Sequence, residues 1–530
     1  MNKRYLIFWI AGLLLFNISC QQKLNKKQKT ELDVHLQGKI NKHSKIPFDS
    51  SSLMVFFRSY PELKNYENQV EGIYRKYNFT HLWFDENGVV EFGNSLYSKF
   101  KGLDKEGVVS VFPYHQKLAG VFEDEIEYTL SKVETELMLT AAFLFYVDKV
   151  YSGIDEKTTA ALEWLLPRKE LSYENVLDSV LLDQTLLDKN HQVLLPQYYK
   201  LRNYLKMYRE IEKQGGWKPI DYNPKMKAIK PGDSSKVIVQ IRQRLFVTGE
   251  LPTNSQSNRY DAEMESAIKK YQLSNGHTVR KEIIPALIAE MNVPVEERIR
   301  KIMINMERCR WISPDIAKSD ELIVVNIPSY MLNYFRDGKN IFRCPVVVGT
   351  NTSKTVIFSG NMSYVVFSPY WNVPESILKS EVKPGIAKDP NYLAKHNMEW
   401  YNGQVRQKPG KSNSLGLVKF LFPNSNNIYL HDTPSKSAFS KADRAFSHGC
   451  IRVGKPRELA LEILKNDPEW PPEKIDAAMN GGTEKWVALK KKIPVYLGYF
   501  TAWVNEAGDI NFYDDVYKRD DRLYKLLIEN

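Results

Sequence analysis

The stretch IYLHDTPSKSAFSKADRAFSHGCIRV, residues 428–453, brings together side chains that can do chemistry. It holds two of the chain's nine histidines, His431 and His448, and one of its four cysteines, Cys450. An imidazole can take or give a proton near neutral pH, and a thiolate is a strong nucleophile. The question is whether this stretch forms a catalytic site, a metal site or an ordinary polar surface.

Three interpretations compete for these residues. A zinc site would use His431, His448 and Cys450, but structural zinc usually takes a fourth ligand and a closely spaced pair such as C-x-x-C, which the stretch lacks. The histidines could also simply cap a strand and a turn. Nucleophilic catalysis fits best, because a thiol with a reference pKa of about 8.5 needs a base. The loop after His431 is long enough to return to Cys450, and His448 alternates with Cys450 across Gly449.

The first twenty residues have the pattern of an export signal. The charged start MNKR precedes an apolar run from Tyr5 to Phe16, which is too short for a stable membrane span. Cys20 follows a small residue and resembles the lipidated cysteine of the bacterial lipobox, although Asn17 stands where leucine is usual. The resemblance implies that Cys20 is lipidated and becomes the mature N-terminus. The basic stretch QQKLNKKQKT then predicts a flexible tether, and we expect no second membrane-crossing segment.

An exported protein makes its cysteines informative, because cysteines in the envelope tend either to pair or to have a reason to stay free. Without Cys20 three remain, an odd number. Cys309 lies in a helical pattern and Cys344 in a strand pattern, so we expect both to be small buried residues. A disulfide between them is left open. In either case Cys450 is left over.

Length and composition indicate several globular domains. The 530 residues are too many for one core and predict about three domains. A hydrophobic fraction of 43% and an aromatic fraction of 12% supply ample core material. The net charge of +11 suits an anionic partner such as nucleic acid, an acidic membrane face or an anionic polymer, or else a solvated basic surface.

The first half of the chain has a helical pattern without a catalytic signature. VETELMLTAAFLFYVDKVYSG predicts an apolar helix that ends at Gly153, and LKNYENQVEGIYRKYNFTHLWFDENG predicts an amphipathic helix before a turn at 86–88. Residues 228–292 predict a separate unit with two amphipathic helices and a third short one. The apolar faces of the two helices consist of Val237, Ile238, Ile241 and Leu245, and of Met264, Ala267, Ile268 and Tyr271.

From Glu321 onward the pattern is that of β-strands. ELIVVNIP and IFRCPVVVG are rich in β-branched residues, and Asp337-Gly338 between them is a preferred two-residue hairpin turn. Residues 375–413 interrupt the strands with Lys, Pro, Gly and Asn and are long enough to form a lid. The predicted fold class is therefore multidomain α+β, with a helical N-terminal part and a mostly-β C-terminal domain.

These motifs resemble one family. HDTP…RAFSHGCIRV, preceded by LGLVKFLFPN and IYL, closely resembles the L,D-transpeptidases of bacterial peptidoglycan, whose pattern is a histidine, a loop and then [S/T]-H-G-C-x-[R/N]. VVVGT, MSYVVFSPYWNVP and TAWVNEAGDINFYDDVY extend the resemblance, and the 228–292 unit resembles peptidoglycan-binding modules. The arrangement is similar to the large multidomain branch of the family. Departures stand at Cys309, Thr350 and Ser414, where that branch usually has Trp, Arg and Ala.

The resemblance implies a role for each residue of the motif. Cys450 is expected to be the nucleophile and His431 the base, oriented by the backbone carbonyl of Asp432 rather than by its carboxylate. His448 and Gly449 are expected to form an oxyanion pocket with the Cys450 N–H.

Two neighbours complete the implied site. Ser447 is expected to fix His448 by a hydrogen bond. Arg452 is expected to steady the site or meet a substrate carboxylate, and a solvated arginine is the alternative. The resemblance implies neither a cofactor nor a metal.

The resemblance also names the domains. We predict a signal peptide over 1–19, a lipidated tether over 20–50, a helical scaffold over 51–224, a peptidoglycan-binding-like domain over 225–293, a linking helix over 294–319, the L,D-transpeptidase catalytic domain over 320–500 with its lid at about 375–413, and a C-terminal extension over 501–530.

The implied reaction joins two peptidoglycan stem peptides. A tetrapeptide donor is expected to acylate Cys450 and lose D-alanine, and the amine of a diamino acid on a second stem then forms a 3→3 cross-link. The same site also permits L,D-carboxypeptidase activity or attachment of a protein to the stem. An inactive peptidoglycan-binding scaffold is the alternative of another class, and the intact His431 and Cys450 disfavour it. A papain-like peptidase is disfavoured because its cysteine precedes its histidine.

The expected partners and location follow from the same resemblance. The enzyme is expected to bind peptidoglycan stem peptides and a membrane through its lipid, and not nucleic acid. The expected place is the cell envelope, as a periplasm-facing lipoprotein of the outer membrane of a Gram-negative bacterium.

Overall fold

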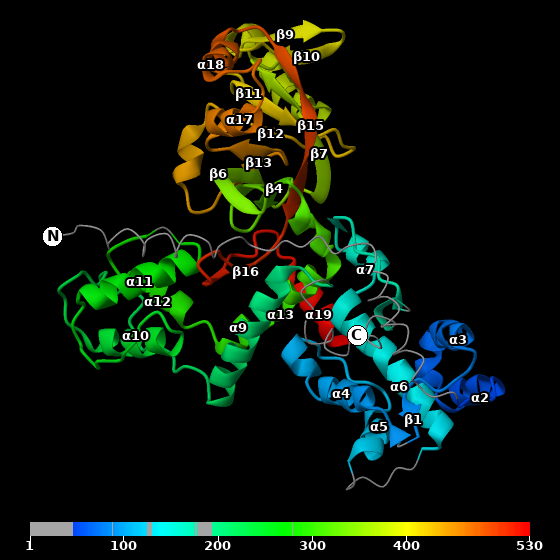
Figure 1. The fold of residues 1–530 in the computed structure, drawn as a ribbon. Coiled ribbons are helices and arrows are strands. Elements are labelled where there is room, and N and C mark those ends of the chain that lie inside the picture. The colour runs from blue at the N-terminus through cyan, green and yellow to red at the C-terminus, as the bar shows by residue number, and fades with distance from the viewer. Residues whose placement is uncertain are drawn as a thin grey trace, which may run out of the picture. The chain divides into compact units, whose positions relative to one another are not determined.

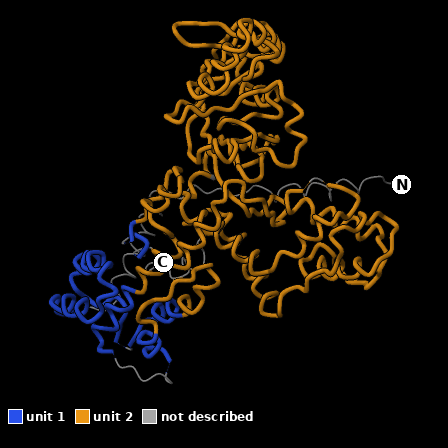
Figure 2. Tube along the Cα trace, turned by 180° about the vertical axis from the view of Figure 1, so that it is seen from behind, with its two compact units in different colours: residues 1–97, 116–141, 172–188 blue, residues 98–115, 142–171, 189–530 orange. Residues whose placement is uncertain are grey.

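The structure is a computed structural model that describes residues 46–86, 88–123, 130–173, 175–177, 193–277 and 279–529 (Figure 1). The predicted signal peptide, Cys20 and most of the tether lie outside these residues, as does Asn87 in the predicted turn. Figure 2 shows two compact units, made of residues 1–97, 116–141 and 172–188 and of residues 98–115, 142–171 and 189–530. The division runs through the range 51–224 that the sequence predicts as one scaffold.

The first unit is mainly helical and is organised around a buried carboxylate. Glu136 accepts hydrogen bonds from the Tyr74 hydroxyl (2.7 Å) and from the backbone N–H groups of Leu82 (2.6 Å) and Trp83 (3.1 Å). A buried charge that is fully hydrogen-bonded in this way has a structural role. The elements are α2 (Ser51–Ser59), η1 (Pro61–Tyr66), α3 (Glu67–Lys76), β1 (Phe84–Asp85), β2 (Gly88–Val89), α4 (Glu91–Phe100), α5 (His115–Phe122) and α6 (Lys132–Tyr146), of which α4, α5 and α6 extend into the second unit.

The predicted apolar helix is confirmed. It consists of α6 and its continuation η3 (Val147–Ser152), and Gly153 follows with φ +67°, a left-handed conformation that favours glycine. The stretch 132–161 is long and apolar enough to cross a membrane by length and composition, which the sequence had not suggested. Since 72% of its most apolar window is buried inside the protein, its environment is that of a core helix.

The three helices predicted within 228–292 are confirmed as α10 (Lys236–Val247), α11 (Ala262–Ser274) and α12 (Pro285–Met291), which belong to the second unit together with the rest of 189–530. The Ser235 and Asp261 side chains cap the first two helices by accepting hydrogen bonds from the backbone. The predicted apolar faces meet in one core cluster. Its members include Ile238, Ile241, Leu245, Met264, Ala267, Ile268, Tyr271, Leu287 and Ile288, while Val237 is only partly buried.

The helix predicted as a linker is a central element of the second unit. α13 (Val295–Trp311) packs against α9 (Pro196–Lys213) and buries charged as well as apolar residues. Arg310 is fully buried, forms an ion pair with Glu307 (2.6 Å) and donates to the Val150 carbonyl (3.0 Å). Because a buried cation without such partners would be very costly, these contacts fix α13 in place. Shorter helices around it are α7 (Glu156–Ala161) and η5 (Pro314–Lys318).

The C-terminal domain is built on a closed sheet. Its strands run in the order β11-β12-β14-β6-β5-β4-β15-β7, and β7 pairs back with β11, so the sheet forms a barrel. The predicted Asp337-Gly338 turn is confirmed, with φ values of +49° and +72°. The strands are β4 (Glu321–Asn326), β5 (Met331–Arg336), β6 (Lys339–Gly349), β7 (Ile357–Phe367), β11 (Val418–Leu421), β12 (Leu430–His431), β14 (Ile451–Val453) and β15 (Lys485–Gly498), with β3 (Trp164–Leu165) paired to β7 and β13 (Ala445–Ser447) paired to β6.

The insertion at 375–413 is a folded element with its own small core rather than an irregular loop. It contains α14 (Glu375–Ile377), η6 (Leu378–Val382), α15 (Lys383–Lys388), α16 (Tyr392–Lys395), β9 (Met398–Tyr401) and β10 (Gln404–Gln407), and β10 also pairs with β8 (Trp371–Asn372). Its core is Val373, Ile377, Leu378, Val382 and Val405. An element with its own core can move as one body or stay in place. The pattern of Lys, Pro and Gly in the sequence did not indicate this core.

The C-terminal extension returns to α13. Thr501 donates its hydroxyl to Asp520 (2.7 Å) and its N–H to Asn305 (2.9 Å), and Asp520 forms an ion pair with Arg308 (2.7 Å). These buried contacts attach the extension to the helix that precedes the barrel. The remaining elements are η7 (Lys436–Ser440), α17 (Pro456–Leu464), α18 (Pro472–Asn480), β16 (Ala502–Val504), β17 (Ile510–Phe512) and α19 (Asp520–Glu529).

Candidate active site

Strand register brings the predicted catalytic residues to one face of the barrel sheet. β12 and β14 run parallel, with His431 opposite Arg452, and the Ile451 N–H donates to the Tyr429 carbonyl (3.1 Å). Residues opposite each other in register point to the same face, and so do residues two apart along a strand. His431, Arg452, Tyr429 and Cys450 therefore share one face.

The imidazole of His431 is held in the form of a base. His431 is 5% exposed, and its Nδ1 lies 2.5 Å from the carbonyl oxygen of Asp432. A carbonyl can only accept, so Nδ1 carries the proton and Nε2 is left with a lone pair. Burial and, to a smaller extent, the Arg452 charge lower the pKa of His431 to about 4, against the opposing effects of the Asp432 carbonyl and of the Asp432 charge. The imidazole is therefore neutral at pH 7.

Asp432 uses its carboxylate to build the turn around this base. It accepts hydrogen bonds from the backbone N–H groups of Leu417 (2.9 Å) and Thr433 (2.6 Å) and pairs with Lys436. Gly416, with φ +62°, lets the chain approach this carboxylate, because a Cβ there would lie 2.3 Å from it. The carbonyl contact to His431 is the one that the family resemblance implies.

Cys450 is partly exposed and protonated in the resting site. Burial raises the pKa of its thiol, while hydrogen bonding by Tyr429 and the charge of Arg452 act in the opposite direction. The thiol donates to the Asn427 carbonyl (3.6 Å) rather than to His431. The structure thus brings base and nucleophile to one face without a direct hydrogen bond between them. Catalytic hydrogen bonds often form only when substrate is bound.

Two residues of this face are absent from the predicted set. Tyr429 lies beside both residues: its ring centroid is 5.7 Å from that of His431, and burial, together with its interactions with Cys450, raises the pKa of the tyrosine. Lys419 of β11 stands opposite His431 in register and is largely buried, which lowers the pKa of its amine. The alternation in IYLH could have indicated Tyr429, whereas Lys419 requires knowledge of the strand pairing.

The turn that carries the nucleophile is fixed by Ser447, which corrects one expectation. The Ser447 hydroxyl donates to the Cys450 carbonyl (2.5 Å) and accepts from the Gly449 N–H (3.2 Å), and it does not hold His448. Gly449 has φ +113°, which few other residues adopt. Its carbonyl accepts from the Thr355 hydroxyl (2.8 Å). The turn is thus constrained from both sides.

These bonds narrow the choice of oxyanion donors. The Gly449 N–H is occupied by Ser447, but within the described part of the chain the Cys450 N–H meets no acceptor. The His448 ring is exposed, and its Nε2 lies 3.3 Å from the carboxylate of Glu381 in η6 of the insertion. His448 therefore connects the nucleophile turn to the insertion, and the Cys450 N–H is the donor left for an oxyanion.

The other two cysteines differ from Cys450. Cys309 and Cys344 are buried free thiols, so they do not form the disulfide that the sequence left open. Among the described residues, no group of three or more His, Cys, Asp or Glu side chains is placed to hold a metal ion.

A thiol, a neutral imidazole and an unoccupied N–H on one sheet face are the components of a cysteine-dependent acyl-transfer site. Comparison with known proteins gives the same class. Residues 320–470 match the family model of the L,D-transpeptidase catalytic domain, and residues 68–205 match that of a scaffold domain. The chain therefore carries an L,D-transpeptidase catalytic domain preceded by a scaffold domain, and the resemblance found in the sequence is confirmed at this level.

Individual relatives are similar over part of the chain. A protein of Haemophilus influenzae described as "Putative L,D-transpeptidase" is 35% identical over 242 residues, which is 42% of this chain and 48% of that protein. This chain thus spans about half the length of the curated relative that it matches.

Two solved structures are also similar at low identity. The L,D-transpeptidase from Mycobacterium smegmatis is 14% identical over 34% of this chain and 58% of that one, with a TM-score of 0.19. The L,D-transpeptidase from Stackebrandtia nassauensis is 16% identical over 52% and 95%, with a TM-score of 0.21.

Proposed function

We propose that the chain is a peptidoglycan L,D-transpeptidase that forms 3→3 cross-links between stem peptides through a thioester on Cys450. The observation that carries the proposal is the shared sheet face, which carries both the Cys450 thiol and a neutral His431 whose Nε2 meets no partner among the described residues. A peptidoglycan-binding scaffold without activity has no use for a buried, oriented imidazole next to a thiol. The match to the family model identifies the catalytic domain alone, and the proposed reaction adds the substrates and the product.

The first half-reaction is acylation. The Cys450 sulfur attacks the carbonyl between residues 3 and 4 of a tetrapeptide stem while its proton passes to Nε2 of His431. The Cys450 N–H donates to the oxyanion, and the imidazolium returns the proton to the departing amine, so D-alanine leaves and a thioester remains. Because the resting imidazole is neutral, the thiolate of Cys450 and the imidazolium of His431 form only during the attack. Arg452 and the Tyr429 hydroxyl then stabilise the thiolate.

The second half-reaction is transfer to an amine. The neutral imidazole takes a proton from the diamino-acid amine of a second stem as that amine attacks the thioester, and the proton goes back to the sulfur. Water in place of the amine gives L,D-carboxypeptidase activity. The contact between His448 and Glu381 places the folded insertion beside the nucleophile turn, where it can exclude water. Lys419 and Arg452 supply cations on the same face for stem carboxylates.

We also propose that the protein works in the cell envelope, held by lipid on Cys20 as a periplasm-facing lipoprotein of an outer membrane. The support is the N-terminal sequence alone. Labelling with radioactive palmitate should mark the wild-type chain and not the Cys20→Ala variant. Label that remains on Cys20→Ala contradicts the lipid anchor and leaves the reaction untouched.

The reaction is tested with purified disaccharide-tetrapeptide. The wild-type chain should release D-alanine and produce a 3→3 dimer detected by liquid chromatography and mass spectrometry, while Cys450→Ala should produce neither. Cys344→Ala is the matched control, since it removes a buried thiol of the same barrel. D-alanine without dimer indicates a carboxypeptidase, and the absence of both products from folded wild-type protein refutes the proposal.

A further inference from the structure

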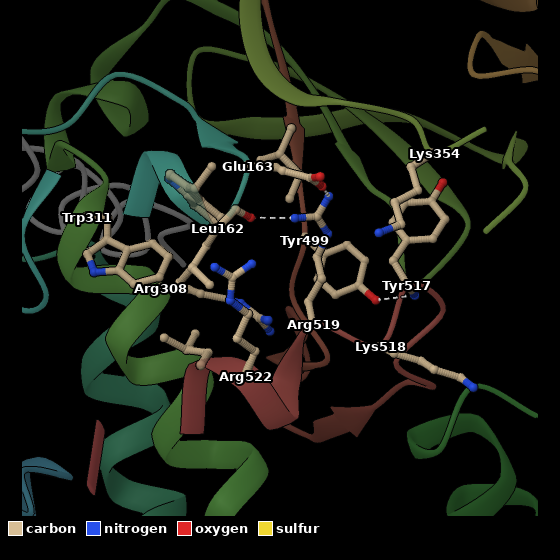
Figure 3. Close-up of a pocket in the computed structure, with 13 residues that line it drawn as sticks. Leu162, Glu163, Arg308, Trp311, Lys354, Tyr499, Tyr517, Lys518, Arg519 and Arg522 are labelled. Atoms are coloured by element: carbon tan, nitrogen blue, oxygen red, sulfur yellow. Dashed lines mark hydrogen bonds and ion pairs between the residues drawn. The ribbon is translucent and has the colours of Figure 1, made fainter. Parts of the chain in front are cut away.

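A cavity of about 110 Å³ in the second unit is lined by none of the residues assigned to the acyl-transfer site (Figure 3). It lies among the end of β15, the C-terminal extension, α13 and the turn after β6. Five of its lining residues are cationic and one, Glu163, is acidic. The cationic residues are Arg308, Lys354, Lys518, Arg519 and Arg522.

The positive charge of this cavity is only partly neutralised. Figure 3 shows the guanidinium groups of Arg308, Arg519 and Arg522 facing the cavity. Arg519 pairs with Glu163 (2.5 Å), whose side chain is 60% exposed, and Arg308 pairs with Asp520 (2.7 Å). Arg522 has no ion-pair partner within the described residues. Since an exposed carboxylate screens weakly, the cavity keeps a net positive potential.

Two buried N–H groups of the lining lack acceptors. The indole Nε1 of Trp164 and the Nε of Arg519 have no hydrogen-bond partner in the described part of the chain. Trp164 is 4% exposed, so water does not readily replace a partner. Buried N–H groups are normally paired, and an unpaired one costs free energy. Both unpaired groups of the lining residues are donors, so a partner for either must be an acceptor.

We propose that this cavity binds a phosphate group. Its volume admits several waters but is below the roughly 300 Å³ of a site for a drug-sized ligand, so the bound group is small. A phosphate carries a charge of about −1.5 to −2 and offers acceptors on all sides, whereas a carboxylate carries one charge. Guanidinium groups also match phosphate oxygens in pairs. Three arginines and an indole N–H therefore fit a phosphate dianion better than a carboxylate with a single charge.

The site is linked to the nucleophile turn. The Tyr517 hydroxyl donates to the Gly349 carbonyl (2.9 Å) and accepts from the Thr355 N–H (3.1 Å), and the Thr355 hydroxyl donates to the Gly449 carbonyl (2.8 Å). Tyr517 and Lys354 line the cavity, while Thr355 and Gly449 support Cys450. A bound phosphate thus lies two hydrogen bonds from the turn that carries the nucleophile.

Calorimetric titration of the full chain with inorganic phosphate at constant ionic strength tests the proposal. Wild type should bind one phosphate, and Arg522→Gln should bind it at least about tenfold more weakly. Arg457→Gln is the matched control, because Arg457 pairs with Asp476 on α17 and α18 and does not line the cavity. Equal affinity of wild type and Arg522→Gln, or no binding at millimolar phosphate, overturns the proposal.

A second arm separates folding from binding and identifies the source of the phosphate. Arg522→Lys keeps the charge without the guanidinium fork and should bind with intermediate affinity, provided that both variants keep the wild-type melting temperature without phosphate. If both variants lose that melting temperature, Lys354→Gln replaces them and must weaken phosphate binding for the proposal to stand. Displacement of phosphate by glycerol 1-phosphate supports a site for phosphoryl groups of larger molecules, and binding of inorganic phosphate alone supports a site for the free ion.

Discussion

Two thiols of the same barrel, Cys450 and Cys344, have very different chemistry. Cys344 lies in β6, is 1% exposed, and burial raises its pKa to about 11. Cys450 precedes β14, the strand paired with β6, and burial raises its pKa as well, but Tyr429 and Arg452 oppose that effect. Cys450 also shares its face with a neutral imidazole and is partly exposed. Neighbours oppose burial at Cys344 as well, where Lys455 and Gly454 act to lower the thiol pKa, so the two thiols differ in their exposure and in the imidazole that only Cys450 has on its face. We expect this difference to decide which thiol reacts.

Replacing each thiol in turn should give the largest difference between the two. Cys450→Ala should lower the rate of D-alanine release by at least about 10⁴-fold, because the proposed acyl intermediate forms on the Cys450 sulfur. Cys344→Ala should leave the rate within a few-fold of wild type. Comparable losses in both variants would show that the assignment of the nucleophile is wrong.

Removing the base tests why only one of the two thiols reacts. His431→Ala should lower the acylation rate by about 10²–10⁴-fold, the usual contribution of general base catalysis. Asp432→Asn should lower it far less, because the backbone carbonyl that orients His431 remains. An equal loss in the two variants would mean that the Asp432 carboxylate, and not its carbonyl, acts on the base.

The neutral state of His431 has a measurable effect on stability. The folded pKa of about 4 lies below the unfolded value of about 6.5, so below pH 6.5 the unfolded chain binds the extra proton. The free energy of unfolding should therefore fall, relative to His431→Gln, by about 3 kcal/mol between pH 6.5 and pH 4. Denaturant titrations measure this, with His396→Gln as a surface control. Parallel pH profiles of wild type and His431→Gln would contradict a buried neutral imidazole.

The smallest expected effect is a change in the pKa of the Cys450 thiol when a neighbouring group is removed. Tyr429→Phe and Arg452→Gln should each move the pH profile of Cys450 alkylation to higher pH, since each removes a group that lowers the thiol pKa. Reaction with iodoacetamide, followed by peptide mass spectrometry, gives the profile. A shift to lower pH in either variant is the opposite of what the contacts imply.

Local features of the fold could be predicted from the sequence. The Asp337-Gly338 turn, the helix end at Gly153 and the buried faces of α10 and α11 each depend on a few neighbouring residues. The insertion could not be predicted, because its core joins Val373 and Val405 across several short helices. The division of the scaffold range between two units likewise depends on contacts between distant segments.

The site shows the same limit. The motif around His431 and Cys450 identified the residues that share the face, since motif and register coincide along β12 and β14. Lys419 and Glu381 reach the site only through strand pairing and the folded insertion. The prediction that Ser447 bonds to His448 is wrong, because several hydrogen-bonding groups lie within three residues of Ser447 and the backbone geometry selects Cys450 and Gly449. The cavity proposed to bind phosphate is lined by residues from five segments of the chain, so no local sequence pattern predicts it.

Trapping the acyl-enzyme on the full chain tests the central claim most directly. The protein is incubated with a carbapenem, digested and analysed by peptide mass spectrometry, so that Cys309 and Cys344 serve as internal controls. We expect one adduct, on the peptide that contains Cys450, and its loss in His431→Ala on the time scale of the wild-type reaction. An adduct on Cys309 or Cys344, or no adduct on folded wild-type protein, would contradict Cys450 as the nucleophile.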